Sequence, residues 1–222
     1  MKTLNDNICV WDNAMSKEWC DELIAMTDEK IKIADRLRER NDGEPNHVYA
    51  GVTFSENKKR IDTSFVMKSY QSMYEKQEEL LICLEECLRE MNHHYLQYTG
   101  YAHVPRIQWS EQITCKVQRT PPGGGFSEWH YEQGSGIGEC ARRWGVWMLY
   151  LNDVEKGGKT DFPVQGLSVT PKAGTMVIWP AAYTHPHRSA PDLEEWKYIV
   201  TGWLQYYIEG ESLLPKGESR LP

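Results

Sequence analysis

The sequence predicts an α+β fold, with helices in its first half and a sheet in its second half. Up to about residue 96, apolar residues recur mainly at helical spacing; from about residue 111, short runs of β-branched and aromatic residues alternate with Gly- and Pro-bearing turns. Helices followed by strands are typical of proteins in which the helices pack against one sheet. We find no internal repeat, low-complexity tract or obvious linker, so residues 1–222 are interpreted as one domain.

Two helices are expected in residues 1–100, which we interpret as a mainly helical support region. The first follows Ser16, a suitable N-cap, and its apolar repeat ends at the charged run DRLRERNDGEP. The second spans roughly 68 to 96 and carries one apolar stripe, formed by Met73, Leu80, Leu84, Leu88, Met91 and Tyr95. Such a stripe requires a sheet or another helix to cover it.

The second half is expected to form a β-sandwich or barrel. The predicted strands are ITCKV, WGVWMLYL, TMVIW and YIVTGWLQYY, and the turns between them include TPPGGG, EKGGK and TPKAG. Several short strands at close spacing favour this architecture. The polar segment at 40 to 60 is expected to be a loop, and one role open to it is to cover a substrate.

Charge and hydropathy exclude some partners. The net charge of −7 disfavours nucleic acid, because binding to phosphates requires clustered basic residues, and the basic runs at 36 to 40 and 58 to 60 are flanked by acidic residues. We therefore interpret these runs as solvated or substrate-facing loops. No apolar stretch is long enough to span a bilayer, so no membrane association is expected.

The six cysteines indicate a reducing compartment. They form no CxxC pair and show no disulfide-framework spacing, and Cys83 and Cys87 have the apolar neighbours of core thiols rather than of a metal site. The first fifteen residues lack the uninterrupted apolar core of a signal peptide. A cytoplasmic location is expected.

Two segments carry candidate metal ligands. In SEWHYEQ, the side chains of Glu128, His130 and Glu132 lie on one face of an extended strand, where they either bind a metal or are simply solvated. In THPHRSAP, His185 and His187 point to the same side if the chain stays extended. Two histidines and one carboxylate are the ligands of the facial triad that leaves open positions on non-haem Fe(II).

One strand of the second half could bind an anion. In KYIVTGW, residues Lys197, Thr201 and Trp203 share one face, so that all three can line one cavity. Taken alone, Lys197 is better explained as an exposed strand lysine.

The stretch from about 111 to 207 resembles the catalytic core of the 2-oxoglutarate and Fe(II)-dependent oxygenases, in particular their prolyl 4-hydroxylase-like branch. A fainter resemblance extends to KKRIDTS at 58 to 64. The matching residues follow one another in the order and spacing of the family: His130 and Glu132, Tyr150-Leu151-Asn152, Gly157-Gly158, Phe162-Pro163, Pro171-Lys172-Ala173-Gly174, Trp179, His187, Lys197 and Trp203.

This resemblance implies a double-stranded β-helix, or jelly-roll, with the N-terminal helices packed on its larger sheet. It implies Fe(II) bound by His130, Glu132 and His187, the last chosen over His185 by its distance from Lys197. It also implies that Lys197, Tyr150 and Thr201 bind 2-oxoglutarate, that O₂ is consumed, and that ascorbate is a possible auxiliary factor.

Several details depart from the family pattern or extend it. The family usually has Asp where this chain has Glu132, whose extra methylene moves the carboxylate about 1.5 Å further from the strand. Glu128 precedes the histidine and is expected to contact solvent or a neighbouring group. Further candidates for cosubstrate or substrate contacts are Lys116, Gln118 and Arg142.

The implied activity is hydroxylation of a substrate C–H bond, with a prolyl residue in a peptide or protein as the leading target. Other side chains and free amino acids remain open, since fold-level analogy does not fix the substrate. Two alternatives are a cupin-like metal isomerase or binding protein without redox chemistry, and a β-sandwich interaction module with a vestigial site. Lys197 argues against a cupin-like site unless an anionic ligand must be bound there. The sequence makes no prediction about oligomeric state.

Overall fold

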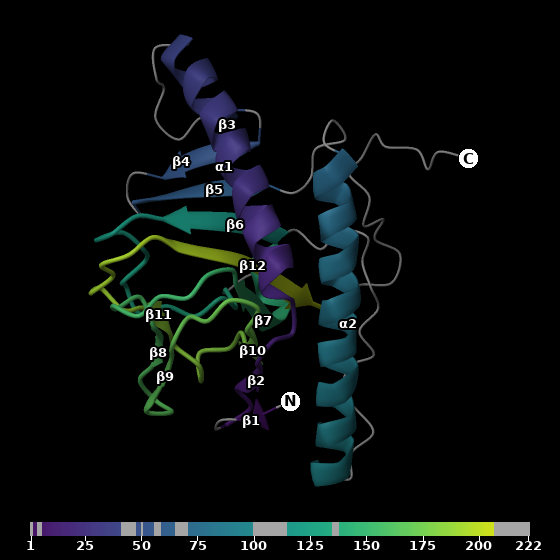
Figure 1. Cartoon of the computed structure of the whole chain (residues 1–222). Coiled ribbons are helices and arrows are strands. Elements are labelled where there is room, and N and C mark those ends of the chain that lie inside the picture. The colour runs from purple at the N-terminus through teal and green to yellow at the C-terminus, as the bar shows by residue number, and fades with distance from the viewer. Residues whose placement is uncertain are drawn as a thin grey trace.

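The computed structural model describes residues 2–3, 6–40, 48–49, 51–55, 59–64, 71–99, 115–134 and 138–206. Two long helices lie against a broad, largely antiparallel sheet, and a smaller sheet faces the other side of it (Figure 1). The helices are α1 (Lys17–Arg40) and α2 (Gln71–Thr99), with a short 3-10 turn, η1, at Glu139–Arg142.

The large sheet contains nine of the strands in the described part of the chain. Its order is β1-β2-β10-β7-β12-β6-β5-β4-β3, and every neighbouring pair is antiparallel. The strands are β1 (Lys2–Thr3), β2 (Cys9–Trp11), β3 (Val48–Tyr49), β4 (Val52–Ser55), β5 (Arg60–Ser64), β6 (Cys115–Thr120), β7 (Arg143–Tyr150), β10 (Met176–Pro180) and β12 (Lys197–Gln205).

The small sheet covers the centre of the large one. Its order is β11-β8-β9, from Arg188–Ser189, Thr160–Phe162 and Leu167–Val169. Phe162 and Val169 pack in one apolar cluster with residues of β2, β7, β10 and β12. Two antiparallel layers with an apolar interior agree with the predicted sandwich.

Strand alternation divides the central strands between two cores. In β7, Trp147 and Leu149 pack in the cluster that contains residues of both helices, whereas Val146 and Met148 pack toward the small sheet. This is the period-two pattern of a sheet buried on both faces. The predicted strands ITCKV, WGVWMLYL, TMVIW and YIVTGWLQYY correspond to β6, β7, β10 and β12.

Both predicted helices are present, and the first extends further than expected. Ser16 Oγ accepts a hydrogen bond from the Trp19 backbone N–H at 3.1 Å, as an N-cap does. On α2, the stripe residues Leu80, Leu84, Leu88 and Met91 are buried, whereas the side chains of Met73 and Tyr95 lie outside the described residues.

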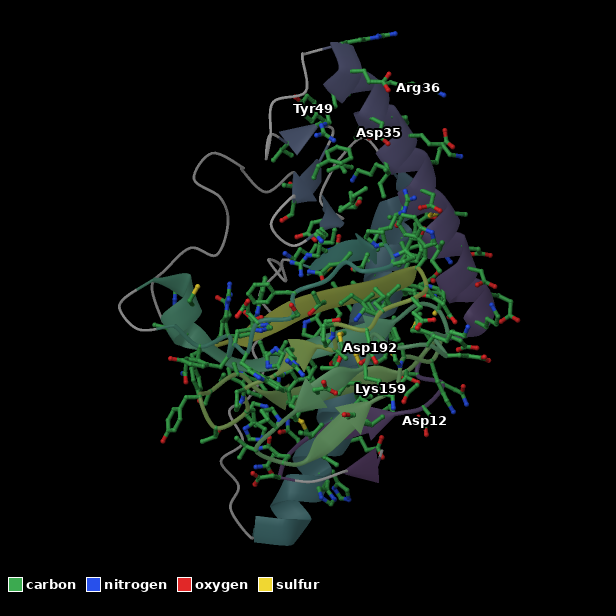
Figure 2. The ribbon with its side chains drawn as sticks, turned by 90° about the vertical axis from the view of Figure 1, so that its left-hand side faces the viewer. Asp12, Asp35, Arg36, Tyr49, Lys159 and Asp192 are labelled. Carbon is green, nitrogen blue, oxygen red and sulfur yellow. The ribbon has the colours of Figure 1, made fainter. Side chains whose placement is uncertain are left out.

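The charged run does not end α1, because it keeps an apolar edge. Ile31, Ala34 and Leu37 are three residues apart and pack against β3 and β4. Asp35 and Arg36 on the same turns are exposed, and Figure 2 shows Tyr49 beside this outer half of the helix. The prediction that the helix ends at the charged run was therefore wrong.

The N-terminal region is also less purely helical than predicted. It supplies β1 and β2 to one edge of the large sheet, and β5, β4 and β3 to the other. Part of the segment expected to be a loop at 40 to 60 is therefore strand, whereas residues 41–47, 50 and 56–58 lie outside the described residues. In the described chain, neither helix has the length and apolarity needed to cross a membrane.

Candidate active site

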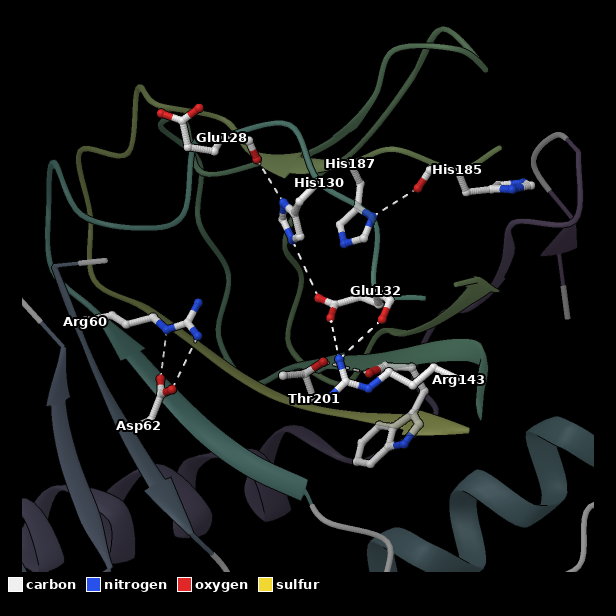
Figure 3. A network of polar contacts seen from close by, with 10 residues as sticks. Arg60, Asp62, Glu128, His130, Glu132, Arg143, His185, His187 and Thr201 are labelled. Atoms are coloured by element: carbon white, nitrogen blue, oxygen red, sulfur yellow. Dashed lines mark hydrogen bonds and ion pairs between the residues drawn. The ribbon is translucent and has the colours of Figure 1, made fainter. Parts of the chain in front are cut away.

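Backbone pairing brings two histidines side by side from segments far apart in the chain. The His130 N–H donates to the His187 carbonyl at 3.1 Å, and the His187 N–H donates to the His130 carbonyl at 2.8 Å. The ring centroids are 4.4 Å apart, and Figure 3 shows both rings above the Glu132 side chain. The ligand atoms of His130, Glu132 and His187 all lie within 4.8 Å of one another.

The same contact orients both imidazole rings. His130 Nδ1 lies 2.8 Å from the Glu128 carbonyl oxygen, and His187 Nδ1 lies 3.1 Å from the His185 carbonyl oxygen. A carbonyl accepts only, so each Nδ1 carries the proton and each Nε2 keeps its lone pair. Histidine ligands of metals are commonly oriented in this way.

Glu132 supplies the third donor. Its Oε1 lies 3.6 Å from His130 Nε2, and its Oε2 accepts a hydrogen bond from Arg143 Nη1 at 3.1 Å. Burial opposes ionisation, but the adjacent imidazoles of His130 and His187 outweigh it and hold the pKa of Glu132 well below its usual range. The group is a carboxylate at neutral pH.

His187 is the more buried of the two imidazoles. Its ring lies edge-on to Trp179, with centroids 5.0 Å apart, and 5.9 Å from Phe162. Burial, and secondarily the neighbouring imidazole of His130, lower the pKa of His187 to about 4, so it is neutral under ordinary conditions. A neutral imidazole and an ionised carboxylate are the forms that bind metal. The residues therefore fit a divalent metal held by three protein ligands.

Two residues that competed for this role lie elsewhere. His185 is buried, but its Nε2 contacts the Asp6 backbone oxygen at 2.5 Å, and its Nδ1 contacts Thr184 Oγ1 at 2.9 Å. It thus links the β1–β2 turn to the segment that carries His187. The Glu128 side chain is exposed and lies away from the cluster in Figure 3.

Lys197 is a buried cation beside this cluster. Its side-chain Nζ donates to the Gly158 carbonyl at 2.8 Å and to Ser189 Oγ at 2.7 Å, and it forms no ion pair with any described residue. Burial, followed by the charge of Arg60, lowers the pKa of Lys197 to about 8. A buried ammonium without a carboxylate partner fits a site for an anionic group of a ligand.

The two hydroxyl residues proposed with Lys197 are placed differently from expectation. Tyr150 is fully buried, and its hydroxyl lies 2.7 Å from Thr160 Oγ1, so Thr160 stands between it and the cavity. Thr201 lines the cavity, but its Oγ1 donates to the Trp147 carbonyl at 2.9 Å. Ser189 is the hydroxyl that contacts Lys197.

One cavity of about 390 Å³ joins these groups, a volume within the usual range for small-molecule sites. Among the residues that line it are His130, Glu132, His187, Lys197, Lys116, Gln118, Arg60, Arg143, Arg188, Ser189, Thr160, Thr201 and Trp203. Lys116 and Gln118 lie where the sequence suggested. Arg142 is not among the lining residues, whereas its neighbour Arg143 is.

Sequence reasoning missed Arg143 because the strand is irregular there. Leu204 pairs with Gly145, but Gln205 pairs with Arg143. At this point β7 therefore has one residue more than β12, and the side chain of Arg143 lies on the opposite face of the sheet from the one that regular alternation predicts. Simple alternation from Trp147 would place Arg143 on the helix side. Instead its guanidinium lies 3.8 Å from the centroid of the Trp203 ring, within the cavity.

Comparison with known proteins agrees with this geometry. Residues 115–205 match the family model of the 2OG-Fe(II) oxygenase superfamily. This segment is a 2OG-Fe(II) oxygenase core. The superfamily is named for Fe(II) and 2-oxoglutarate (2OG), and the triad and the buried Lys197 fit this metal and this dianionic cosubstrate.

Curated relatives of the oxygenase core are prolyl 4-hydroxylase subunits. The chain is 39% identical over 66 residues to prolyl 4-hydroxylase subunit alpha-1 of Gallus gallus, and 38% identical over 66 residues to the subunit of Homo sapiens. These matches cover 27% of this chain but only 13% and 12% of the relatives. The chain therefore matches a small part of their length.

Solved structures show the same fold for the oxygenase core and the elements around it. The viral collagen prolyl hydroxylase of Paramecium Bursaria Chlorella virus-1 superposes with a TM-score of 0.60 at 19% identity, covering 91% of this chain and 97% of that one. A Pseudomonas putida prolyl-4-hydroxylase gives a TM-score of 0.57 at 17% identity, covering 90% and 93%. The predicted double-stranded β-helix with helices on its larger sheet is confirmed.

Proposed function

We propose that this chain is an Fe(II)- and 2-oxoglutarate-dependent dioxygenase that hydroxylates a C–H bond, with a prolyl residue of a peptide as the preferred target. The observation that carries the proposal is one cavity holding both a two-histidine, one-carboxylate cluster and a buried lysine that forms no ion pair with any described residue. The prolyl target is supported by the relatives, which include a Trichoplax adhaerens prolyl hydroxylase in complex with a hypoxia inducible factor peptide fragment.

His130, Glu132 and His187 would hold the metal through Nε2, a carboxylate oxygen and Nε2. When bound, Fe(II) and 2-oxoglutarate supply the oxidising power, one oxygen atom of O₂ entering the substrate C–H bond and the other the succinate formed with CO₂. Arg143 fixes the carboxylate of Glu132 through its 3.1 Å hydrogen bond, which compensates for the extra methylene of this ligand.

Lys197 and Ser189 would bind the distal carboxylate of 2-oxoglutarate. Their 2.7 Å contact places an ammonium and a hydroxyl together, and both groups can donate to an incoming carboxylate. The sequence analysis assigned the hydroxyl role to Tyr150 and Thr201. In this proposal Tyr150 acts indirectly, by positioning the Thr160 hydroxyl at the cavity wall.

The cupin-like alternative is not favoured. An isomerase or binding site without redox chemistry would use the same three metal ligands but would not require a buried cation, whose desolvation destabilises the fold unless an anion binds there. The sequence match to the oxygenase superfamily also spans the segments that carry both Lys197 and His187.

The proposal is tested by visible spectroscopy of purified protein mixed with Fe(II) and 2-oxoglutarate in the absence of oxygen. We expect a weak charge-transfer band that is lost in His187→Ala and requires more cosubstrate in Lys197→Ala. His185→Ala is the matched control and retains the band, because His185 contacts Asp6 and Thr184 instead of the metal site. Absence of the band in the wild-type protein at saturating metal and cosubstrate would refute the proposal.

We also propose a reducing, cytoplasmic environment, with ascorbate as an auxiliary reductant that keeps the metal ferrous. Support comes from the six cysteines, which are all free in the structure and of which five are buried. Thiol titration of protein isolated under anaerobic conditions should find six free thiols after unfolding. The role of ascorbate is tested by comparing turnover numbers with and without it.

A further inference from the structure

Positive charge is concentrated in the cavity although the chain as a whole has a net charge of −7. Five cations line it: Arg60, Lys116, Arg143, Arg188 and Lys197. Among the acidic residues of the described chain, only Glu132 is part of the lining. Arg143 offsets Glu132 at 3.1 Å, and Arg188 lies 3.6 Å from Asp161 behind the wall, so these two are individually neutralised.

Arg60 and Lys116 share a single carboxylate. Asp62 Oδ1 lies 2.8 Å from Arg60 Nε, and Asp62 Oδ2 lies 2.7 Å from Lys116 Nζ. Arg60 and Asp62 belong to β5 and Lys116 to the adjacent β6, and Figure 3 shows the guanidinium of Arg60 extending from Asp62 toward the metal ligands. We call these three residues the Arg60–Asp62–Lys116 arm.

The arm retains an uncompensated positive charge. Burial opposes ionisation of Asp62, but the charges of Arg60 and Lys116 lower its pKa, so Asp62 carries one negative charge against two positive ones. The contacts to Asp62 use Nε and Nη2 of Arg60 and leave Nη1 without a hydrogen-bond partner among the described residues. A guanidinium held on one side by a carboxylate is preorganised to bind a second anion on the other.

The arm is adjacent to the reaction site. Lys116 Nζ lies 5.8 Å from the centroid of the Trp203 ring, and Arg143, which contacts Glu132, lies 3.8 Å from the same centroid. Trp203 therefore lies next to both Lys116 of the arm and Arg143, which contacts the proposed metal ligand Glu132. An anionic group bound by the arm would lie beside whatever part of the substrate reaches the metal.

We propose that the Arg60–Asp62–Lys116 arm binds a side-chain carboxylate of the substrate, so that the preferred substrates are peptides with Glu or Asp next to the reacting residue. The inference rests on the proposed function, because it assigns the substrate class of the same cavity. The arm has a net charge of one positive unit, from two cations and one carboxylate, and this matches the charge of one substrate carboxylate. Nucleic acid requires several phosphate contacts, which the negative net charge of the chain opposes.

The test uses protein loaded with Fe(II) and 2-oxoglutarate without oxygen, and three short fluorescent peptides with a central proline flanked by Glu, Gln or Lys. In fluorescence anisotropy, the Glu peptide should have the lowest dissociation constant, the Gln peptide an intermediate one and the Lys peptide the highest. We expect the dissociation constants of neighbouring peptides to differ by roughly two- to fivefold, as for one partly exposed ion pair. The preference should shrink as ionic strength rises.

Three variants assign the preference to the arm. Lys116→Gln should remove most of the preference for the Glu peptide, and Lys116→Arg, which keeps the charge, should restore it. Arg89→Gln is the matched control, because Arg89 is an exposed cation paired with Glu85 on α2. This helix packs on the face of the large sheet opposite to the small sheet and the cavity. Circular dichroism and Tm show whether each variant is folded.

Equal affinity for the three peptides, absence of binding by all of them, or a preference that survives Lys116→Gln would overturn the inference. Tighter binding of a single-stranded oligonucleotide than of the Glu peptide would likewise overturn it in favour of nucleic acid. The charge-transfer band forms without any peptide, so it tests the proposed function separately. Loss of the band and loss of the peptide preference are therefore distinguishable failures.

Discussion

Replacing Lys197 with Met should stabilise the protein while strongly weakening cosubstrate binding. Burial lowers the pKa of Lys197 from 10.5 to about 8. At about 1.4 kcal/mol per pKa unit, this shift corresponds to a penalty of about 3 kcal/mol for keeping the buried lysine charged. The two hydrogen bonds from Nζ to Gly158 and Ser189 return about 1 kcal/mol each, so Lys197→Met should raise the free energy of unfolding by about 1 kcal/mol at pH 7.

The pH dependence of this effect has a definite sign. Below pH 8 Lys197 is protonated in both the folded and the unfolded state, and the full penalty applies. As pH rises from 8 to 10.5, the folded protein releases this proton first, so the wild-type protein gains stability that Lys197→Met does not gain. The advantage of the variant should therefore vanish toward pH 10.

Urea denaturation at pH 7 and pH 9.5 measures the stability difference, and titration with 2-oxoglutarate under anaerobic conditions measures binding. We expect the variant to be at least as stable as wild type at pH 7 and its affinity for 2-oxoglutarate to fall by about a hundredfold, the loss of one buried charge-assisted contact. A variant clearly less stable at pH 7, or one that keeps wild-type affinity for 2-oxoglutarate, would refute the reasoning.

Other substitutions test the metal site, a turn and the core. Arg143→Gln should weaken Mn²⁺ binding in equilibrium dialysis by about tenfold, because the metal-binding carboxylate loses its oriented partner; unchanged affinity would contradict this role. Gly157→Ala should lower the free energy of unfolding by more than 2 kcal/mol, since φ is +77° and an added Cβ would overlap a backbone oxygen at 1.9 Å, whereas Gly123→Ala at φ +69° meets no atom and should cost about 1 kcal/mol. Leu84→Ala in the buried stripe of α2 should cost about 3 kcal/mol in urea denaturation, against less than about 0.5 for Ile82→Ala, which is 60% exposed; similar costs would contradict the placement of the helix face.

Much of the architecture could be predicted because local patterns carry it. The four predicted strands of the second half are β6, β7, β10 and β12, since β-branched and aromatic runs between Gly and Pro turns have no competing helical periodicity. The apolar stripe of α2 could be predicted because its residues repeat at helical spacing. The extent of α1 was misjudged because Leu37 continues the apolar edge of Ile31 and Ala34 into a run dominated by charge.

The sequence by itself determined the chemical inventory of the site: His130 and Glu132 two residues apart, the histidines that follow TMVIW, and a lysine on an alternating strand. Residue type and the period of two are local properties, so these were available without a structure. The strand predicted for SEWHYEQ is not formed, and only His130 makes an isolated bridge there.

Only the tertiary structure decided how this inventory is used. The backbone pairing of His130 with His187 sets the two rings next to each other, and the contact of His185 with Asp6 turns that imidazole away. An extra residue in β7 turns Arg143 into the cavity, and packing beside Ser189 buries Lys197, which the strand pattern alone could have left exposed. Each outcome depends on contacts between residues distant in the chain, and on desolvation that exists only once the two sheets have packed.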